Sequence, residues 1–120
     1  TIDLTMGHAN VIWQGDANSV ALRCLAHATT PTTPINVTGP ETFEVAKVAE
    51  EFGRLLGKKP KFTGKPAPTG WINNAARMVK EFGPPSVPLA KLIEWNADWV
   101  ARDMKTINKP TKYEVRDGTY

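Results

Sequence analysis

The stretch INVTGPETFEVAKVAEEFGRLLG, residues 35–57, decides the fold class that the sequence predicts. Residues 35–38 are expected to form a brief strand that ends at Gly39-Pro40. A helix follows, with Thr42 as its expected cap and with Gly57 where a left-handed C-terminal cap is typical. The helix carries one apolar stripe at helical spacing, made of Val45, Val48, Ala49, Phe52, Leu55 and Leu56. Strand, turn and helix in this order predict a layered α/β fold.

The residues before this stretch predict two short strands and a helix. Residues 2–5 and 10–14 are largely apolar or β-branched, and Met6-Gly7-His8 separates them. Asp16 is placed to accept hydrogen bonds from the first N–H groups of the helix. The apolar positions of that helix are Ala17, Val20, Ala21, Cys24, Leu25 and Ala28. Two prolines within residues 29–34 end it.

The residues after Gly57 predict one more strand and two more helices, which gives four helices with short strands in all. The strand is expected at 60–63, and a loop rich in Pro and Gly follows at 64–70. Asn73 or Asn74 caps a helix whose apolar face is Ile72, Ala75, Ala76, Val79 and Phe82. After the break at 83–85, Pro88 suits the first turn of a last helix with Leu89, Leu92, Ile93, Trp95, Trp99 and Val100. Residues 1–104 are thus expected to fold, and residues 105–120 to form an extended tail.

The composition is that of an ordinary globular chain of one domain, with 120 residues, 41% hydrophobic and 22% charged. A net charge of +3 is too small and scattered for a nucleic-acid protein. Lys58, Lys59, Lys61 and Lys65 form the nearest approach to a basic cluster, which suits a solvated loop or, less well, an anion site. No apolar stretch is long enough to cross a bilayer, and no signal peptide is visible. Because the single cysteine also fits a reducing compartment, we expect a cytoplasmic protein.

Sequence motifs for known chemistry are not found. The nine glycines never take the Gly-x-Gly-x-x-Gly spacing of a dinucleotide-binding turn, and there is neither a P-loop nor a Gly-x-Ser-x-Gly elbow. Cys24 and His27 lie one turn apart, but the stripe buries Cys24, so we expect no metal site. The carboxylates that might pair for acid–base chemistry are expected on solvated helix faces; they are Glu50, Glu51, Glu94 and Asp98.

Two tryptophans near turns stand out as candidates for ligand contact. Trp13 lies beside Gly15 at the end of a predicted strand, and Trp71 follows the Pro/Gly-rich loop. A tryptophan in such a place lines a pocket or fills a small core beside the helices. The residues themselves leave both interpretations open.

The order of the segments resembles the C-terminal third of the NAD-dependent epimerase/dehydratase family, the extended short-chain dehydrogenases/reductases. Residues 10–18 (NVIWQGDAN) look like its strand–Asp–helix segment, and residues 35–57 look like its late strand and following helix. Residues 74–83 (NAARMVKEFG) with Pro85 are similar to its helix that ends in a Gly-x-Pro turn, and 89–100 resembles its closing helix. The resemblance covers roughly residues 2–103 and implies a C-terminal fragment of a Rossmann-type fold.

The resemblance implies a parent enzyme that binds NAD or NADP through a part preceding this chain. In that family the earlier part supplies the glycine-rich turn and a Tyr-x-x-x-Lys pair that moves a proton beside the nicotinamide. Here the fourth residue after Tyr113 is Asp117, so this chain is expected to hold no catalytic residue and no cofactor. The absence of an initiator methionine before Thr1 also leads us to expect a cut chain. The expected partners are the N-terminal nucleotide-binding part, a small-molecule substrate and further copies in a homo-oligomer, with neither nucleic acid nor membrane.

The chain departs from the nucleotide-sugar members of the family. Ala9 stands at a position where they often have arginine, Trp13 replaces a histidine, and Lys65 falls near a second phosphate-binding arginine. Loss of bidentate arginine contacts favours a smaller or less anionic substrate. We predict substrate contacts from Asn10, Trp13, Lys65 and Trp71. Rival hypotheses are a free-standing small-molecule binding module and an oligomerisation element of the same architecture.

Overall fold

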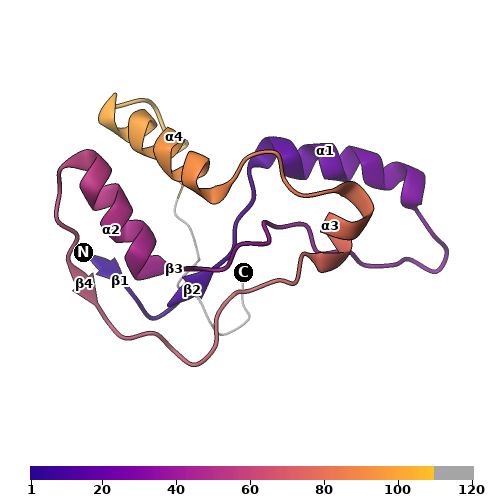
Figure 1. The fold of residues 1–120 in the computed structure, drawn as a ribbon, viewed down its shortest axis with the longest axis horizontal. Helices are drawn as coiled ribbons and strands as arrows, with labels where there is room; N and C mark the ends of the chain where they lie inside the picture. The colour runs from indigo at the N-terminus through magenta and orange to yellow at the C-terminus, as the bar shows by residue number, and fades with distance from the viewer. Residues whose placement is uncertain (110–120) are drawn as a thin grey trace. The chain divides into compact units, whose positions relative to one another are not determined.

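The computed structural model describes residues 1–109, which divide into two compact units (Figure 1). Of the described residues, the first unit contains Thr1–Ala9, Phe43–Trp71 and 93–109. The second unit contains Asn10–Thr42 and Ile72–Leu92. The predicted tail begins at 105 without a regular element up to 109, and its remainder lies outside the described residues.

The first unit contains four strands of two residues each, in two small sheets. β1 (Ile2–Asp3) pairs in parallel with β4 (Phe62–Thr63). β2 (His8–Ala9) pairs antiparallel with β3 (Phe43–Glu44). Ala9 also forms an isolated parallel bridge with Trp71. Strands predicted at 2–5 and 60–63 are confirmed in place but are shorter.

The helix predicted after Gly39-Pro40 is α2 (Val45–Leu56), and it belongs to the first unit. Its residue Ala49 is buried, and the Val45 N–H donates to the Gly7 carbonyl oxygen at 2.8 Å. The helix ends at Gly57, which has φ 65° and confirms the predicted left-handed cap. The predicted Thr42 cap is wrong. Pairing of Phe43–Glu44 in β3 delays the helix start, so Glu44 is the N-cap residue.

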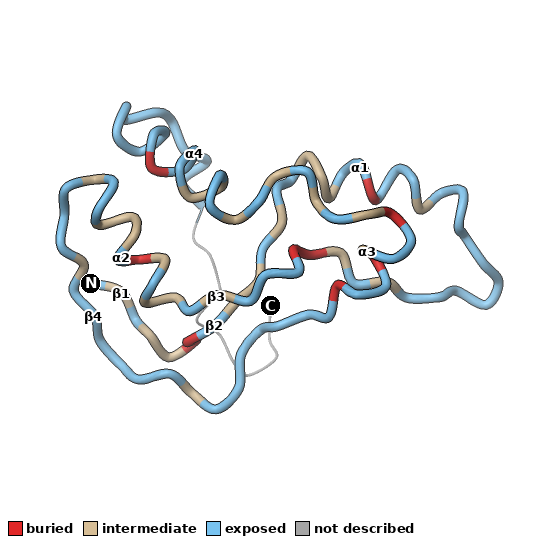
Figure 2. Tube along the Cα trace, in the orientation of Figure 1, coloured by how far each residue is buried: buried red, intermediate tan, exposed pale blue. Residues whose placement is uncertain are grey.

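The core of the second unit lies between two helices. They are α1 (Gln14–Cys24), continued by the 3₁₀ turn η1 (Leu25–His27), and α3 (Ala76–Phe82). The buried core side chains are Val20, Ala75, Met78 and Phe82, and the partly buried ones around them are Ile12, Cys24, Ile35, Val37 and Val79. Figure 2 shows these buried positions along α1 and α3. Only part of the predicted stripe on α1 is therefore used, since Leu25 is 77% exposed.

The last helix, α4 (Leu89–Ala101), starts directly after Pro88, as the sequence predicts. The Pro88 carbonyl oxygen accepts the N–H groups of Lys91 and Leu92 at 3.0 and 3.2 Å. The Glu41 carboxylate accepts the Leu89 N–H at 3.2 Å, which satisfies one of the free donors at the helix start. Trp95 and Trp99 are exposed on this helix.

Two strand predictions are wrong, at 10–14 and at 35–38. Within the described residues neither segment joins a ladder, and α1 already begins at Gln14. Both segments contribute apolar side chains to the core of the second unit, namely Ile12, Ile35 and Val37. A strand needs a paired neighbour, whereas these residues are held by side-chain packing and by single bonds such as Gly39 N–H to the Val11 carbonyl at 3.1 Å.

The fold class is nevertheless the predicted one, because residues 1–109 contain four α-helices and four short strands. Parallel and antiparallel pairs occur together. None of the helices within these residues is long and apolar enough to span a membrane. The arrangement is a mixed α/β structure with few strand residues.

Candidate functional site

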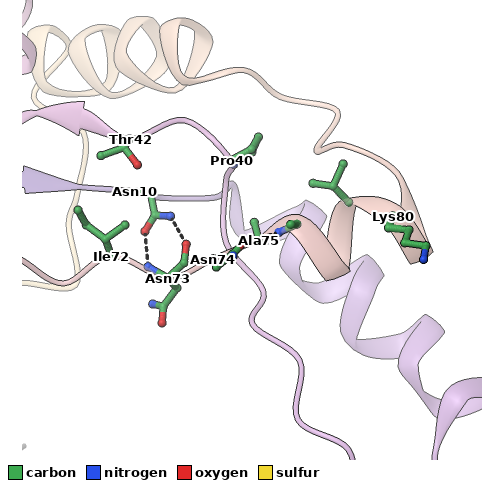
Figure 3. A pocket seen from close by; sticks show the side chains of 10 residues that line it. Asn10, Pro40, Thr42, Ile72, Asn73, Asn74, Ala75 and Lys80 are labelled. Carbon is green, nitrogen blue, oxygen red and sulfur yellow. Dashed lines mark hydrogen bonds between the residues drawn. The ribbon is translucent and has the colours of Figure 1, made fainter.

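A pocket with a volume of about 700 Å³ lies in the second unit, between the loop before α3 and the segment at Pro40 (Figure 3). We call it the Asn10 pocket. Its lining residues are Asn10, Pro40, Thr42, Ile72, Asn73, Asn74, Ala75, Ala76, Val79 and Lys80. The wall thus combines three asparagines and a hydroxyl with an apolar surface, which is typical of sites for small polar molecules.

Asn10 connects the two segments that form the pocket wall. Its Nδ2 donates to the Asn73 carbonyl oxygen at 2.7 Å and to the Gly39 carbonyl oxygen at 3.2 Å. Its Oδ1 accepts the Asn73 N–H at 3.3 Å, so the amide pairs with both backbone groups of that residue (Figure 3). Both ends of the Asn10 amide are therefore used within the protein, and this residue sets the shape of the pocket wall.

The loop into α3 is fixed by two further asparagines. The Asn74 Oδ1 accepts the Ala76 N–H at 2.9 Å and so satisfies a donor at the helix start. Asn36 Nδ2 donates to the Asn74 carbonyl oxygen at a longer 3.4 Å. The prediction that Asn73 or Asn74 is the N-cap is wrong, because Ala75 occupies that position, although the Asn74 side chain still accepts the Ala76 N–H. Asn73 is a lining residue of the pocket, and its side-chain amide is not engaged by the other described residues.

Close packing behind the pocket leaves no room for a side chain at Gly39. A Cβ atom there would overlap the Val11 carbonyl oxygen, to which the Gly39 N–H is bonded. On the other side, Ala75 and Val79 belong both to the pocket lining and to the core around Met78, which is 1% exposed. The wall is therefore continuous with the best-packed part of the unit, which favours a pre-formed pocket.

The charge in the Asn10 pocket comes from one residue, Lys80. The neighbouring carboxylate Glu81 is engaged by Arg77, whose Nε lies 2.8 Å from Glu81 Oε1. The hydrogen bond from Arg77 holds the pKa of Glu81 below its ordinary value against the opposing effect of desolvation, and the positive charges of Arg77, His27 and Lys80 lower it further. Lys80 thus remains the positive group of the pocket.

A second polar contact of this unit holds the loop before α4 on α1. Asp16 Oδ1 accepts the Ser86 hydroxyl at 2.7 Å, and Asp16 Oδ2 accepts the Val87 N–H at 3.1 Å. Desolvation acts to raise the pKa of Asp16, but the hydrogen bonds from Ser86 and Val87 outweigh it and keep that pKa below its ordinary value. The predicted capping role of Asp16 is wrong, because this carboxylate bonds to a distant loop while Trp13 occupies the N-cap.

Of the four residues predicted to contact substrate, Asn10 lines this pocket and the other three do not. Trp13 precedes α1 in the second unit and is 40% exposed. Lys65 and Trp71 belong to the first unit, where both are exposed. The substrate contacts of all four stay predictions.

The lysine cluster and the Cys24/His27 pair that the sequence also suggested lie outside the Asn10 pocket. Lys58 and Lys59 are exposed and line a smaller pocket of about 480 Å³ in the first unit, together with Glu50 and Arg54. Cys24 is half-buried, and the ring of His27 packs edge-on against Phe82 at 5.1 Å. Among residues 1–109, no group of three His, Cys, Asp or Glu side chains is placed to hold a metal ion.

The carboxylates considered for acid–base chemistry lie on helix surfaces. Glu50, Glu94 and Asp98 are exposed, as predicted, and Glu51 is half-buried. Glu51 pairs with Arg54, and Asp98 pairs with Arg102 at 2.8 Å. These are one-turn ion pairs on helices, which contribute little to stability.

Sequence reasoning missed Thr42, Ile72, Asn73 and Lys80 as pocket residues. Thr42 and Asn73 were considered only as helix caps, and Lys80 was given no role. A usable signal is the pair Asn73-Asn74 directly after a loop rich in Pro and Gly, because one asparagine suffices to cap a helix and the second is then available for another role.

Comparison with solved structures shows the same fold in part of the UDP-glucuronic acid 4-epimerase of Bacillus cereus, whose crystal structure contains NAD. The two proteins share 15% sequence identity with a TM-score of 0.63. The match covers 87% of this chain but 35% of the epimerase chain, so this chain spans about a third of that enzyme. No protein-family model and no curated protein matches the sequence. The likeness shows the fold, a fragment of the Rossmann-type epimerase architecture.

Proposed function

We propose that this chain is the substrate-side portion of an NAD(P)-dependent epimerase, dehydratase or reductase-like enzyme and is not catalytic by itself. The observation that carries the proposal is the shared fold with a portion of an NAD-binding epimerase over 87% of this chain. The sequence agrees, since it has neither the glycine-rich turn nor a Tyr-x-x-x-Lys pair. The nucleotide-binding part of the enzyme supplies the cofactor, NAD or NADP, which takes and returns a hydride.

In this proposal the second unit shapes the substrate pocket. The Asn10 amide holds the loop before α3 in place through its bonds to Gly39 and Asn73. Pre-organised polar groups on packed elements position a substrate with little loss of entropy on binding. Trp13, exposed just before α1, lies outside the lining of this pocket, so the contact proposed for it is with a part of the substrate beyond the pocket. The chemistry itself depends on residues outside this chain.

The exposed apolar side chains on α1 support a partner surface. Leu22 is 70% exposed and Leu25 is 77% exposed, three residues apart on one face of the helix. The opposite face of α1 already packs on the core through Val20 and Cys24. Large apolar side chains gathered on one face are typical of a surface that another polypeptide covers. We assign this face to the nucleotide-binding part of the enzyme and, in its absence, to contacts between copies.

Sedimentation and native mass spectrometry of the 120-residue chain at several concentrations test this assignment. The chain is expected to associate, and the double variant L22Q/L25Q is expected to shift it toward monomer with an unchanged helix signal. Glu50→Gln on the exposed surface of α2, in the first unit, is the control and should leave the association unchanged. A wild-type chain that stays a stable monomer at high concentration contradicts the assignment.

A free-standing small-molecule binding module is the second candidate. The observation that favours it is that every residue lining the Asn10 pocket belongs to the second unit. Such a module requires a self-sufficient core, so it should melt cooperatively as a monomer. The portion of a larger enzyme should instead melt as an associated species whose Tm rises with protein concentration.

A further inference from the structure

The side chains that line the Asn10 pocket indicate which kind of ligand the pocket can bind. Among residues 1–109, its lining contains one cation, Lys80, and no carboxylate. Around it stand the polar side chains of Thr42, Asn73 and Asn74, against an apolar surface of Ile72 and Val79. An anion that enters this pocket meets no negative side chain of the lining and can pair with the positive charge of Lys80.

Several of these polar groups are available to a ligand. The Asn10 amide is used at both ends, and Asn74 Oδ1 is used by the Ala76 N–H. By contrast, within residues 1–109 no hydrogen bond or ion pair engages the Asn73 amide, the Thr42 hydroxyl or the Lys80 ammonium. The neighbouring carboxylate of Glu81 forms its ion pair with Arg77, and the charge of Lys80 acts on that carboxylate without a direct ion pair. The pocket therefore offers donors and acceptors at one end and a cation at the other.

Lys80 and the other polar groups lie at different places along the pocket. Lys80 lies four residues after Ala76 on α3, which corresponds to roughly 6 Å along the helix axis. Figure 3 shows Lys80 toward the far end of α3, away from the cluster of Asn10, Asn73 and Thr42. A ligand that uses both places must therefore carry its negative charge at a different end from the hydroxyl groups that bond near Thr42.

We propose that the Asn10 pocket binds a small polyhydroxylated carboxylate with a single negative charge, and not a nucleoside diphosphate sugar. The carboxylate pairs with Lys80, and hydroxyl groups bond to Asn73 and Thr42. A single lysine is a point charge with no bidentate geometry, so it matches one carboxylate better than a pyrophosphate. The proposal deepens the proposed function and rests on it for the view that this ligand is a substrate. Binding itself is testable without it.

Titration of the complete 120-residue chain, followed by calorimetry and by NMR shifts of the asparagine side-chain amides, tests the proposal. The probes are D-gluconate, its uncharged counterpart D-glucitol, and uridine diphosphate. We expect gluconate to bind at least about tenfold more tightly than either of the others, with shifts at the Asn73 amide. Lys80→Met should remove the preference for gluconate over glucitol, and Lys80→Arg should retain most of it.

Lys59→Met is the matched control, since Lys59 is an exposed lysine outside the pocket. It should leave the affinity for gluconate unchanged. Equal binding of glucitol, tighter binding of uridine diphosphate, or no binding of any probe would overturn the proposal. These outcomes are separable from failure of the proposed function, because the association of the chain through Leu22 and Leu25 is measured without any ligand.

Discussion

Replacing Asn10 by alanine is expected to destabilise the second unit by removing the connection between two backbone segments. The side chain donates to the carbonyl oxygens of Asn73 and Gly39 and accepts the Asn73 N–H, at distances of 2.7, 3.2 and 3.3 Å. Alanine can make none of these bonds. The partly buried Gly39 carbonyl oxygen then loses its side-chain donor, while the exposed backbone N–H and carbonyl of Asn73 form hydrogen bonds with water instead.

The magnitude follows from how buried each bond is. A typical intramolecular hydrogen bond contributes about 0.5–1.5 kcal/mol net, because water replaces it in the unfolded chain. Here the bond to Gly39 is partly buried and the two bonds to Asn73 are exposed. We therefore expect the variant to lose about 1.5–2 kcal/mol of unfolding free energy, near the lower end of the roughly 1.5–4.5 kcal/mol that three bonds could contribute.

Urea denaturation of wild type and N10A, followed by circular dichroism, gives the difference in unfolding free energy. Asn36→Ala is the matched control. It removes an asparagine of the same unit that makes one exposed bond of 3.4 Å, so it should change stability by less than about 0.5 kcal/mol. If N10A were as stable as N36A, Asn10 would not hold the pocket wall, and the geometry derived for the pocket would be refuted.

Three further predictions concern the core, the acid limit and the tryptophan. Met78→Ala should cost about 2–5 kcal/mol of unfolding free energy, because Met78 is 1% exposed, whereas Met104→Ala at 40% exposure should cost far less; urea titration compares them. Asp16 has a lowered folded-state pKa, so its contribution to stability is present above about pH 4 and is lost as the pH falls through the folded-state pKa. Asp16→Asn should flatten that acid limb in a pH series of melting curves, and an unchanged limb would assign it to other carboxylates. Trp13→Ala in the intact enzyme should raise KM or lower kcat with little loss of stability, and a loss of about 3–5 kcal/mol would instead mark Trp13 as a packing residue.

The helices were the predictable part of this fold. The apolar stripe from Val45 to Leu56 and the glycine after it both produced the structure they predict, because period and C-cap are local properties of the chain. The helix start was not predictable from local sequence. Phe43 and Glu44 pair with His8 and Ala9, more than thirty residues earlier, and that pairing keeps them out of the helix.

The wrong strands have the same physical origin. Ile35 and Val37 have strand propensity, yet a strand forms only beside a partner, and these two side chains pack on the core of the second unit instead. Conversely, His8–Ala9 has little strand character and pairs because β3 lies beside it. Whether such a segment forms a strand depends on the segments that lie beside it in the fold, and local sequence does not reveal these neighbours.

Only one of the residues that line the pocket was among the predicted substrate contacts. Asn10 was selected for substrate contact, and it lines the pocket by organising the backbone of Gly39 and Asn73. Lys80 and Thr42 were missed because each has an ordinary local role, on a helix surface and before a helix start. Their convergence depends on how the chain folds between residues 42 and 73, which no spacing rule describes.

The central claim is that this chain is the substrate-side portion of a larger cofactor-dependent enzyme. The most direct test is to determine the in-frame coding sequence that precedes Thr1. The claim predicts a strand followed by a Gly-x-Gly-x-x-Gly turn and, farther along, a Tyr-x-x-x-Lys pair, all upstream of the present chain. A start codon immediately before Thr1, or an upstream segment with neither motif, would contradict it.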